Sequence, residues 1–156
     1  FRLGSATAGA ATTTRKLVIK TTAIADAVAT DVITVTVPNA NHAAAVKLTF
    51  VSSNGGADAF ESSRTGYGVV VLARTTGVAT VATAVALASA DIATVAAGAT
   101  HTLAYDLSGI VGAVGATQTF TIRVTINDSG NLGSNQIVTL AEVINAETTG
   151  VTIAAV

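Results

Sequence analysis

The fold is decided by a stretch in the last third of the chain, which reads Thr119-Phe120-Thr121-Ile122-Arg123-Val124-Thr125-Ile126. Polar and apolar side chains alternate there without a break. Successive side chains of an extended strand point to opposite faces, so this alternation predicts a strand over 117–127 with one buried and one solvent-facing side. Residues 32–37 repeat the pattern, with Ile33, Val35 and Val37 predicted to point inward. Thr34 and Thr36 are predicted to point outward. Strand structure is therefore predicted for both halves of the chain.

Further strands are predicted around these two. They fall at 16–22, 45–51, 67–74, 100–105, 136–145 and 149–154. The apolar run 69–72 is predicted to be a central strand that is buried on both faces. Residues 78–97 are Ala/Val/Thr segments of ambiguous period. Alternating Thr and Val favour strands there, and a helix over 79–90 stays an alternative because Ala is a good helix former.

Turn-forming residues separate the predicted strands. They gather at 38–42, 52–56, 108–115 and 128–134. We predict that residues 136–145 return beside 117–127 as the second strand of a hairpin. About nine or ten short strands with frequent turns indicate an all-β fold, either a β-sandwich or a jelly-roll-like arrangement.

The domain organisation is predicted to be simple. Residues 1–14 lack any period and are predicted to be an extended arm or linker, followed by a single β-sandwich domain over 15–156. The chain begins at Phe1 and contains no Met, so we expect either proteolytic processing or a longer translation product. It also contains no Cys, which excludes disulfides and Cys-based metal sites.

The composition points to association rather than to chemistry. Half of the residues are hydrophobic and only 11% are charged, against about 25% in an average protein. Such a surface resists association poorly, so we expect much of it to be covered by copies of the chain or by partners. The longest charge-free runs, 75–90 and 107–122, are too short and too polar for a membrane span. No basic cluster supports nucleic-acid binding.

Candidate catalytic and metal-binding groups are few. His42 and His101 are predicted to be solvated surface residues, because no nucleophile motif surrounds any Ser. Residues 128–131 resemble a calcium loop in composition but lack its spacing, so a plain turn is favoured. We therefore predict no enzyme activity, no cofactor and no metal site.

The most distinctive segment covers residues 59–68, which are predicted to form a long loop. It gathers aromatic and charged side chains, the mixture that a binding loop uses. The alternative is an internal pair between Glu61 and Arg64 that staples the loop together with packing of Phe60. With the two large apolar residues of the arm added, the interface candidates are Phe1, Leu3, Phe60, Glu61, Arg64 and Tyr67.

Four stretches carry a resemblance to a known class of protein. They are Phe60-Glu61-Ser62-Ser63-Arg64-Thr65-Gly66-Tyr67-Gly68, Ala73-Arg74-Thr75-Thr76-Gly77, residues 119–126, and Ala141-Glu142-Val143-Ile144-Asn145-Ala146. Over about the last two thirds of the chain, they resemble the small Thr/Ala/Val-rich β-proteins of tailed-phage virions. The resemblance implies a subunit that forms trimers or lattices with copies of itself and binds a major capsid or tail protein. It implies no catalytic residues.

Three functional hypotheses follow. The first is a bacteriophage structural protein on the virion surface, most simply a capsid decoration or cement subunit that stabilises the shell by subunit contacts. The second is an exported extracellular filament or surface-layer subunit, which polymerises when its arm adds a strand to a neighbour's sheet. The third is a carbohydrate- or receptor-binding module, which ranks last because only four Phe and two Tyr are present.

Overall fold

The structure is a computed structural model that describes residues 14–56, 59–94, 101–128, 134–146 and 150–156. Nine β-strands and no helix lie in these residues. The strands are β1 Thr14–Ile24, β2 Thr30–Val37, β3 His42–Gly56, β4 Ala59–Arg74, β5 Val81–Thr94, β6 His101–Leu107, β7 Gln118–Asp128, β8 Ser134–Asn145 and β9 Thr152–Ala155. The predicted all-β class is confirmed. The predicted arm lies almost wholly outside the described residues.

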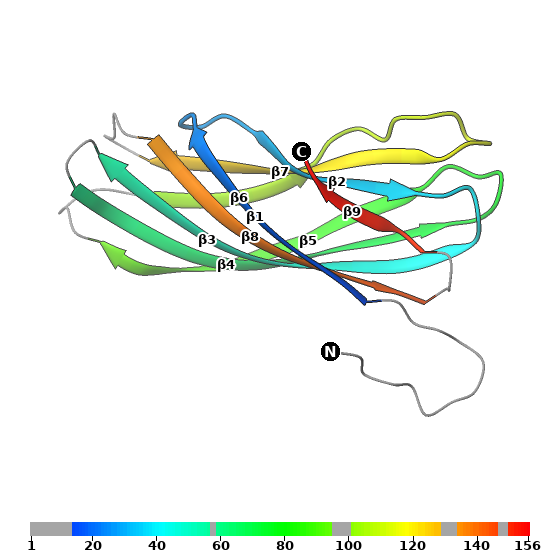
Figure 1. The fold of residues 1–156 in the computed structure, drawn as a ribbon, viewed down its shortest axis with the longest axis horizontal. Coiled ribbons are helices and arrows are strands. Elements are labelled where there is room, and N and C mark those ends of the chain that lie inside the picture. Colours follow the sequence, from blue (N-terminus) through cyan, green and yellow to red (C-terminus); the bar gives the residue numbers. More distant parts are fainter. Residues whose placement is uncertain (1–13, 57–58, 95–100, 129–133, 147–149) are drawn as a thin grey trace, which may run out of the picture.

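The strands form two antiparallel sheets that lie one over the other (Figure 1). One sheet has five strands in the order β1-β8-β3-β4-β5, and the other has four in the order β6-β7-β2-β9. β1 pairs with β8 in the first sheet, and β2 pairs with β7 in the second. Each sheet therefore combines strands from both halves of the chain. This architecture is a β-sandwich, as predicted.

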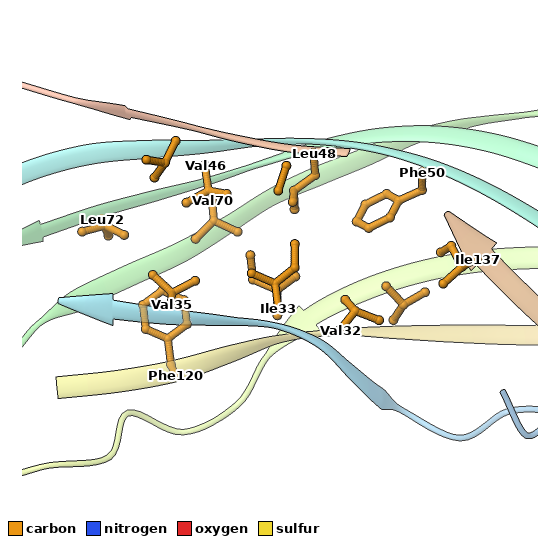
Figure 2. Packing of buried hydrophobic residues seen from close by; sticks show 14 of the residues in the cluster. Val32, Ile33, Val35, Val46, Leu48, Phe50, Val70, Leu72, Phe120 and Ile137 are labelled. Carbon is orange, nitrogen blue, oxygen red and sulfur yellow. The ribbon is translucent and has the colours of Figure 1, made fainter. Parts of the chain in front are cut away.

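The core fills the space between the two sheets. In β7 the apolar residues predicted to point inward are all buried, namely Phe120, Ile122, Val124 and Ile126. Figure 2 shows Ile33 and Val35 of β2 directed toward Val46 and Leu48 of β3 across the gap. Fully burying one such side chain stabilises the fold by about 1.5–3 kcal/mol. The alternating aliphatic residues therefore supply the main force that joins the sheets.

Two predicted loops are strands instead. Residues 52–56 belong to β3 and residues 59–68 to β4, and the two strands pair from His42↔Arg74 to Gly56↔Ala59. Ser and Gly were interpreted as turn formers there, but ladder hydrogen bonds to β8 and β4 on either side of β3 hold these residues extended. The predicted binding loop is therefore part of a long hairpin.

Two other predictions about the strands are resolved or corrected. The alternative of a helix over 79–90 is wrong, because Val81–Thr94 forms β5 and pairs with β4. The predicted hairpin of 117–127 with 136–145 is also wrong. β7 lies in the four-stranded sheet, whereas β8 lies in the other sheet between β1 and β3. The chain therefore changes sheets between the end of β7 at Asp128 and the start of β8 at Ser134.

No helix in the described part of the chain has the length and apolar character needed to cross a membrane.

Candidate functional site

The outer face of the five-stranded sheet, which points away from the core, carries large apolar side chains on every strand. Each of them is between 38% and 67% exposed. We call this set the apolar outer face, and its members are Val18, Val51, Tyr67, Val71, Val81, Val85, Val138 and Leu140. A contiguous apolar surface of this kind is uncommon on a monomer, so this face is a candidate interaction site.

The strand register brings these residues together. Across the sheet, Val18 lies opposite Leu140, Leu140 opposite Thr49, and Thr49 opposite Tyr67. Residues directly opposite each other on neighbouring strands have Cβ atoms about 4.5–5.5 Å apart. Val69, half-buried on the same face, lies opposite Val85 of β5. The apolar outer face is therefore one continuous surface.

One row of charged residues crosses this face. Lys16 of β1 lies opposite Glu142 of β8, which in turn lies opposite Lys47 of β3. The Lys16 Nζ atom is 3.9 Å from Glu142 Oε1, and the Lys16 side chain is 66% exposed. An exposed pair of this kind adds at most about 1 kcal/mol to stability. The row therefore contributes little to folding, but it puts two positive charges and one negative charge in fixed places on an apolar surface.

The outer face of the four-stranded sheet has a different character. Threonines dominate it, with Thr34 and Thr36 of β2 opposite Thr121 and Thr119 of β7. Arg123 binds the Asp106 carboxylate with two hydrogen bonds of 2.9 and 2.5 Å. The hydrogen bond to Asp106 raises the pKa of Arg123, so the guanidinium stays charged. This face satisfies its charges internally, and the two faces of the sandwich are chemically distinct.

Tyr105 fixes the strands that carry the apolar outer face. Its ring reaches from β6 to β4 and lies where a Cβ on Gly68 would come within 2.5 Å of the ring. The hydroxyl accepts a hydrogen bond from the Val69 N–H at 3.1 Å, and the carbonyl oxygens of Val69 and Val85 lie within reach of its single proton. Burial raises the pKa of Tyr105. The ring therefore joins the two sheets at β4 and β5.

Arg74 fixes the other end of β4. Arg74 is 4% exposed, and its guanidinium donates hydrogen bonds to backbone carbonyls among the described residues. The acceptors are Val78 at 3.2 Å, Val37 at 2.9 Å, Pro38 at 3.1 Å, Val114 at 2.8 Å and Ala116 at 2.6 Å. These carbonyls belong to the last residue of β2 and to the connections that follow β2, β4 and β6, so one side chain holds three loops together.

Side-chain amides reinforce the same end of the sandwich. Gln118 accepts a hydrogen bond from the Thr80 N–H at 2.8 Å and donates one to the Gly112 carbonyl at 3.0 Å. Asn39 accepts from the Gly77 N–H and donates to the Gly115 carbonyl. The loops at this end are cross-linked by hydrogen bonds, so the strands between them are held in a fixed register.

Of the interface candidates singled out from the sequence, the structure describes the side chains of two, Arg64 and Tyr67, and these two do not lie together. Phe1 and Leu3 lie outside the described residues, as do the side chains of Phe60 and Glu61, whose backbones belong to β4. Tyr67 lies on the apolar outer face and is 57% exposed. Arg64 lies opposite the buried Ser52 and so belongs to the inner side of β4. Because Arg64 and Tyr67 are on opposite faces, they cannot form a joint binding loop.

His42 corrects another expectation. It was predicted to be a solvated surface residue, yet it is 5% exposed and lies opposite Arg74 in the hairpin of β3 and β4. His42 and Arg74 line a pocket of about 260 Å³ with five other residues. Ligand pockets usually hold about 300–1,000 Å³, so this hollow is small for an organic ligand. No group of three His, Asp or Glu residues within the described ranges is arranged to hold a metal ion.

The main features of the site were missed from the sequence. In the sequence, Arg74 and Tyr105 look like ordinary polar residues near the ends of strands. Each lies two residues from a buried residue of its strand, however, and so points to the same, inner side. The apolar outer face was concealed by the interpretation of residues 69–72 as buried on both sides. In fact Val70 and Leu72 are buried, whereas Val71 is 44% exposed. The signal that could have revealed the apolar outer face is the run of consecutive valines 69–71. Successive residues of a strand point to opposite faces, so such a run puts valine on the outer face as well as in the core.

Comparison with solved structures finds a similar fold in the tailspike protein of Acinetobacter baumannii phage AM24. The TM-score is 0.53, the sequence identity is 11%, and the match covers 93% of this chain and 28% of the tailspike chain. The chain thus spans less than a third of the length of that protein. At this identity the likeness concerns the fold alone. No protein-family model and no curated protein sequence matches the chain.

Proposed function

We propose that this chain is a structural protein of a bacteriophage virion and that it works by binding neighbouring protein through its apolar outer face. The observation that carries the proposal is the exposure of eight large apolar side chains on one rigid sheet. Their burial against a neighbour would yield about 25 cal/mol for each Å² removed from water. The similarity in fold to a phage tailspike protein supports a place in the virion.

Two positions in a virion fit such a subunit. The composition and the resemblance to small phage β-proteins favour the capsid surface, where the chain would be a decoration or cement subunit. The fold shared with a tailspike protein favours the tail. In both positions the mechanism is the same, since many copies would stabilise the particle by burying apolar area between neighbours.

The exported filament stays the alternative. β1 pairs with β8 along one edge and is the end strand of its sheet. A segment from a neighbour could add to such an open edge by main-chain hydrogen bonds. That mechanism places the contact at a sheet edge, whereas the virion proposal places it on the sheet face.

Immunogold labelling of native particles that contain the chain tests the proposal. We expect label on icosahedral shells or on tails, and its position decides between decoration subunit and tail protein. Label along fibres that lack shells and tails would overturn the virion assignment in favour of the filament.

Substitution of the interface candidates tests the contact surface. Tyr67→Ala on the apolar outer face is expected to lower the number of copies bound per particle, because it removes the largest side chain of that face. Arg64→Ala on the inner side of β4 is the matched change on the same strand and is expected to leave occupancy unchanged in folded protein. Full occupancy of Tyr67→Ala would contradict the assignment of this face as the contact.

A further inference from the structure

The charges on the apolar outer face restrict what can cover it. Lys16, Glu142 and Lys47 follow one another across β1, β8 and β3 in the order positive, negative, positive. A partner that buries this face must leave each of these charges beside an opposite charge, either in its own sheet or in the partner, because an unpaired charge loses its hydration on burial. A second copy of the chain carries the same row of charges. Its glutamate and lysine can therefore face the lysine and glutamate of the first copy.

We propose that the apolar outer face binds the same face of a second copy, around a twofold axis that runs parallel to the strands between β8 and β3. This inference rests on the proposed function in one respect, namely that the face is covered by protein in the particle. A twofold axis makes an isologous interface, in which each contact occurs twice. Here the axis places Glu142 of each copy against Lys47 of the other.

The same axis aligns the apolar residues. Each row of the sheet then faces the same row of the second copy, with β8 opposite β3 and β1 opposite β4. Val138 faces Val51 of the second copy, and Val18 faces Tyr67 of the second copy. Lys16 faces the uncharged Val69 of the second copy and keeps its opposite charge in its own sheet, where its Nζ atom is 3.9 Å from Glu142 Oε1. Two sheets packed in this way lie about 10 Å apart, with strand directions within about 30° of each other.

Other axes parallel to the strands are less favourable. An axis through β8 would put Glu142 against Glu142 of the second copy, so that two negative charges would face each other. An axis between β3 and β4 would put Glu142 against Val85 and Lys47 against Val69, so no charge of the row would meet an opposite charge of the second copy. An axis between β1 and β8 also pairs Glu142 with Lys16, but it overlaps only two strands of each copy instead of four. A stable interface usually buries about 1,200–2,000 Å² in total, and this requirement favours the larger overlap.

The face-to-face pair would also bury residues 69–72 on both faces, which is the environment that their sequence predicts. In a single copy, only one side of β4 is covered, and Val71 stays 44% exposed. In the pair, the second copy covers the outer side of the same strand. The continuous run of valines would then be buried on both faces, as is usual for runs of this type.

Complementary charge reversals test the proposal in the purified full chain. Glu142→Lys alone and Lys47→Glu alone each put like charges together twice across the axis. We expect each variant to dimerise on the order of 100-fold more weakly than the native chain. In a mixed pair, the lysine introduced in one variant would face the glutamate introduced in the other, and the remaining native Lys47 and Glu142 would face each other. The mixture is therefore expected to regain the dimer.

Sedimentation velocity is the readout, with the native chain expected at twice its 15.3 kDa monomer mass. Recovery in the mixture cannot arise from the pairing of Glu142 with Lys47 within one chain, because neither variant regains that pair. Asp31→Lys on the opposite sheet makes the same change in net charge as Glu142→Lys and is expected to leave the dimer intact. Circular dichroism confirms that each variant keeps its strands.

Two results would overturn the inference. One is a native chain that sediments as a monomer at every concentration, and the other is a variant mixture that stays monomeric. If Glu142→Lys nevertheless loses its place on the particle, the face binds a different virion protein. The identification of a second copy as the partner would then be wrong, while the proposed function would stand.

Discussion

Arg74 shows how a single side chain determines the shape of one end of the molecule. Its five hydrogen bonds end on the carbonyl of the last residue of β2 and on carbonyls of the connections that follow β2, β4 and β6. A guanidinium suits this role because it has five donors in a fixed plane and keeps its charge when buried. The sequence could not predict this role, because the five carbonyls are brought together only by folding.

Substitution of Arg74 tests this role. Arg74→Leu is expected to lower the free energy of unfolding by about 3 kcal/mol, because several buried carbonyls lose their donor. Urea unfolding followed by circular dichroism measures the change. Arg123→Leu is the matched control on the outer face of the four-stranded sheet and is expected to cost far less. Equal losses in the two variants would contradict the role assigned to Arg74.

Tyr105 provides a second test at the residue scale, with a defined pH dependence. Tyr105→Phe removes the hydroxyl that bonds β4 and β5 and is expected to cost about 1 kcal/mol at neutral pH. Burial raises the pKa of Tyr105 in the folded protein, whereas the unfolded residue ionises near pH 10. Above about pH 10 unfolding releases this proton, so the native chain loses the stability that the neutral hydroxyl gives.

The difference in unfolding free energy between the native chain and Tyr105→Phe is therefore expected to shrink as the pH rises past about 10. Unfolding by urea at a series of alkaline pH values measures it. All other ionisable side chains are the same in both proteins, so their contributions cancel in the comparison. A difference that stays constant with pH would show that the hydroxyl is not buried in this contact.

At the scale of the element, strands that alternate strictly could be predicted and those that do not were misjudged. β7 was correct in position and in its buried side because residues 119–126 alternate without exception. The end of β3 was mistaken for a loop, since Ser and Gly carry little strand signal and only the ladders on both sides hold them extended. The pairing of β8 could not be predicted, because turn residues mark a reversal of the chain but not the sheet to which it returns.

Neighbouring valines in β4 test the division between core and outer face. Val70 is fully buried and Val71 is 44% exposed. Val70→Ala is expected to lower the free energy of unfolding by about 2 kcal/mol, because it leaves a cavity in the core. Val71→Ala is expected to change it by no more than about 0.5 kcal/mol in dilute protein. It should instead weaken dimerisation in sedimentation experiments. Equal effects of the two changes on both measurements would contradict this division.

At the scale of the whole molecule, the two outer faces of the sandwich differ in chemical character. The threonine-rich face of the four-stranded sheet binds its charges internally, and the opposite face presents apolar side chains around a single charged row. The low content of charged residues predicts an associating surface, and the apolar outer face is the surface that we propose for this role. Its location could not be predicted, because it depends on which strands lie side by side.

The accessibility of Val71 in the assembled particle tests the central claim most directly. The chain contains no Cys, so Val71→Cys introduces a single thiol on the apolar outer face. Ala113→Cys in an exposed loop reports whether a maleimide reagent reaches the protein at all. We expect the thiol at position 71 to be protected in intact particles and to react once they are dissociated into monomers. Equal reaction rates in intact and dissociated particles would contradict the claim that this face is covered.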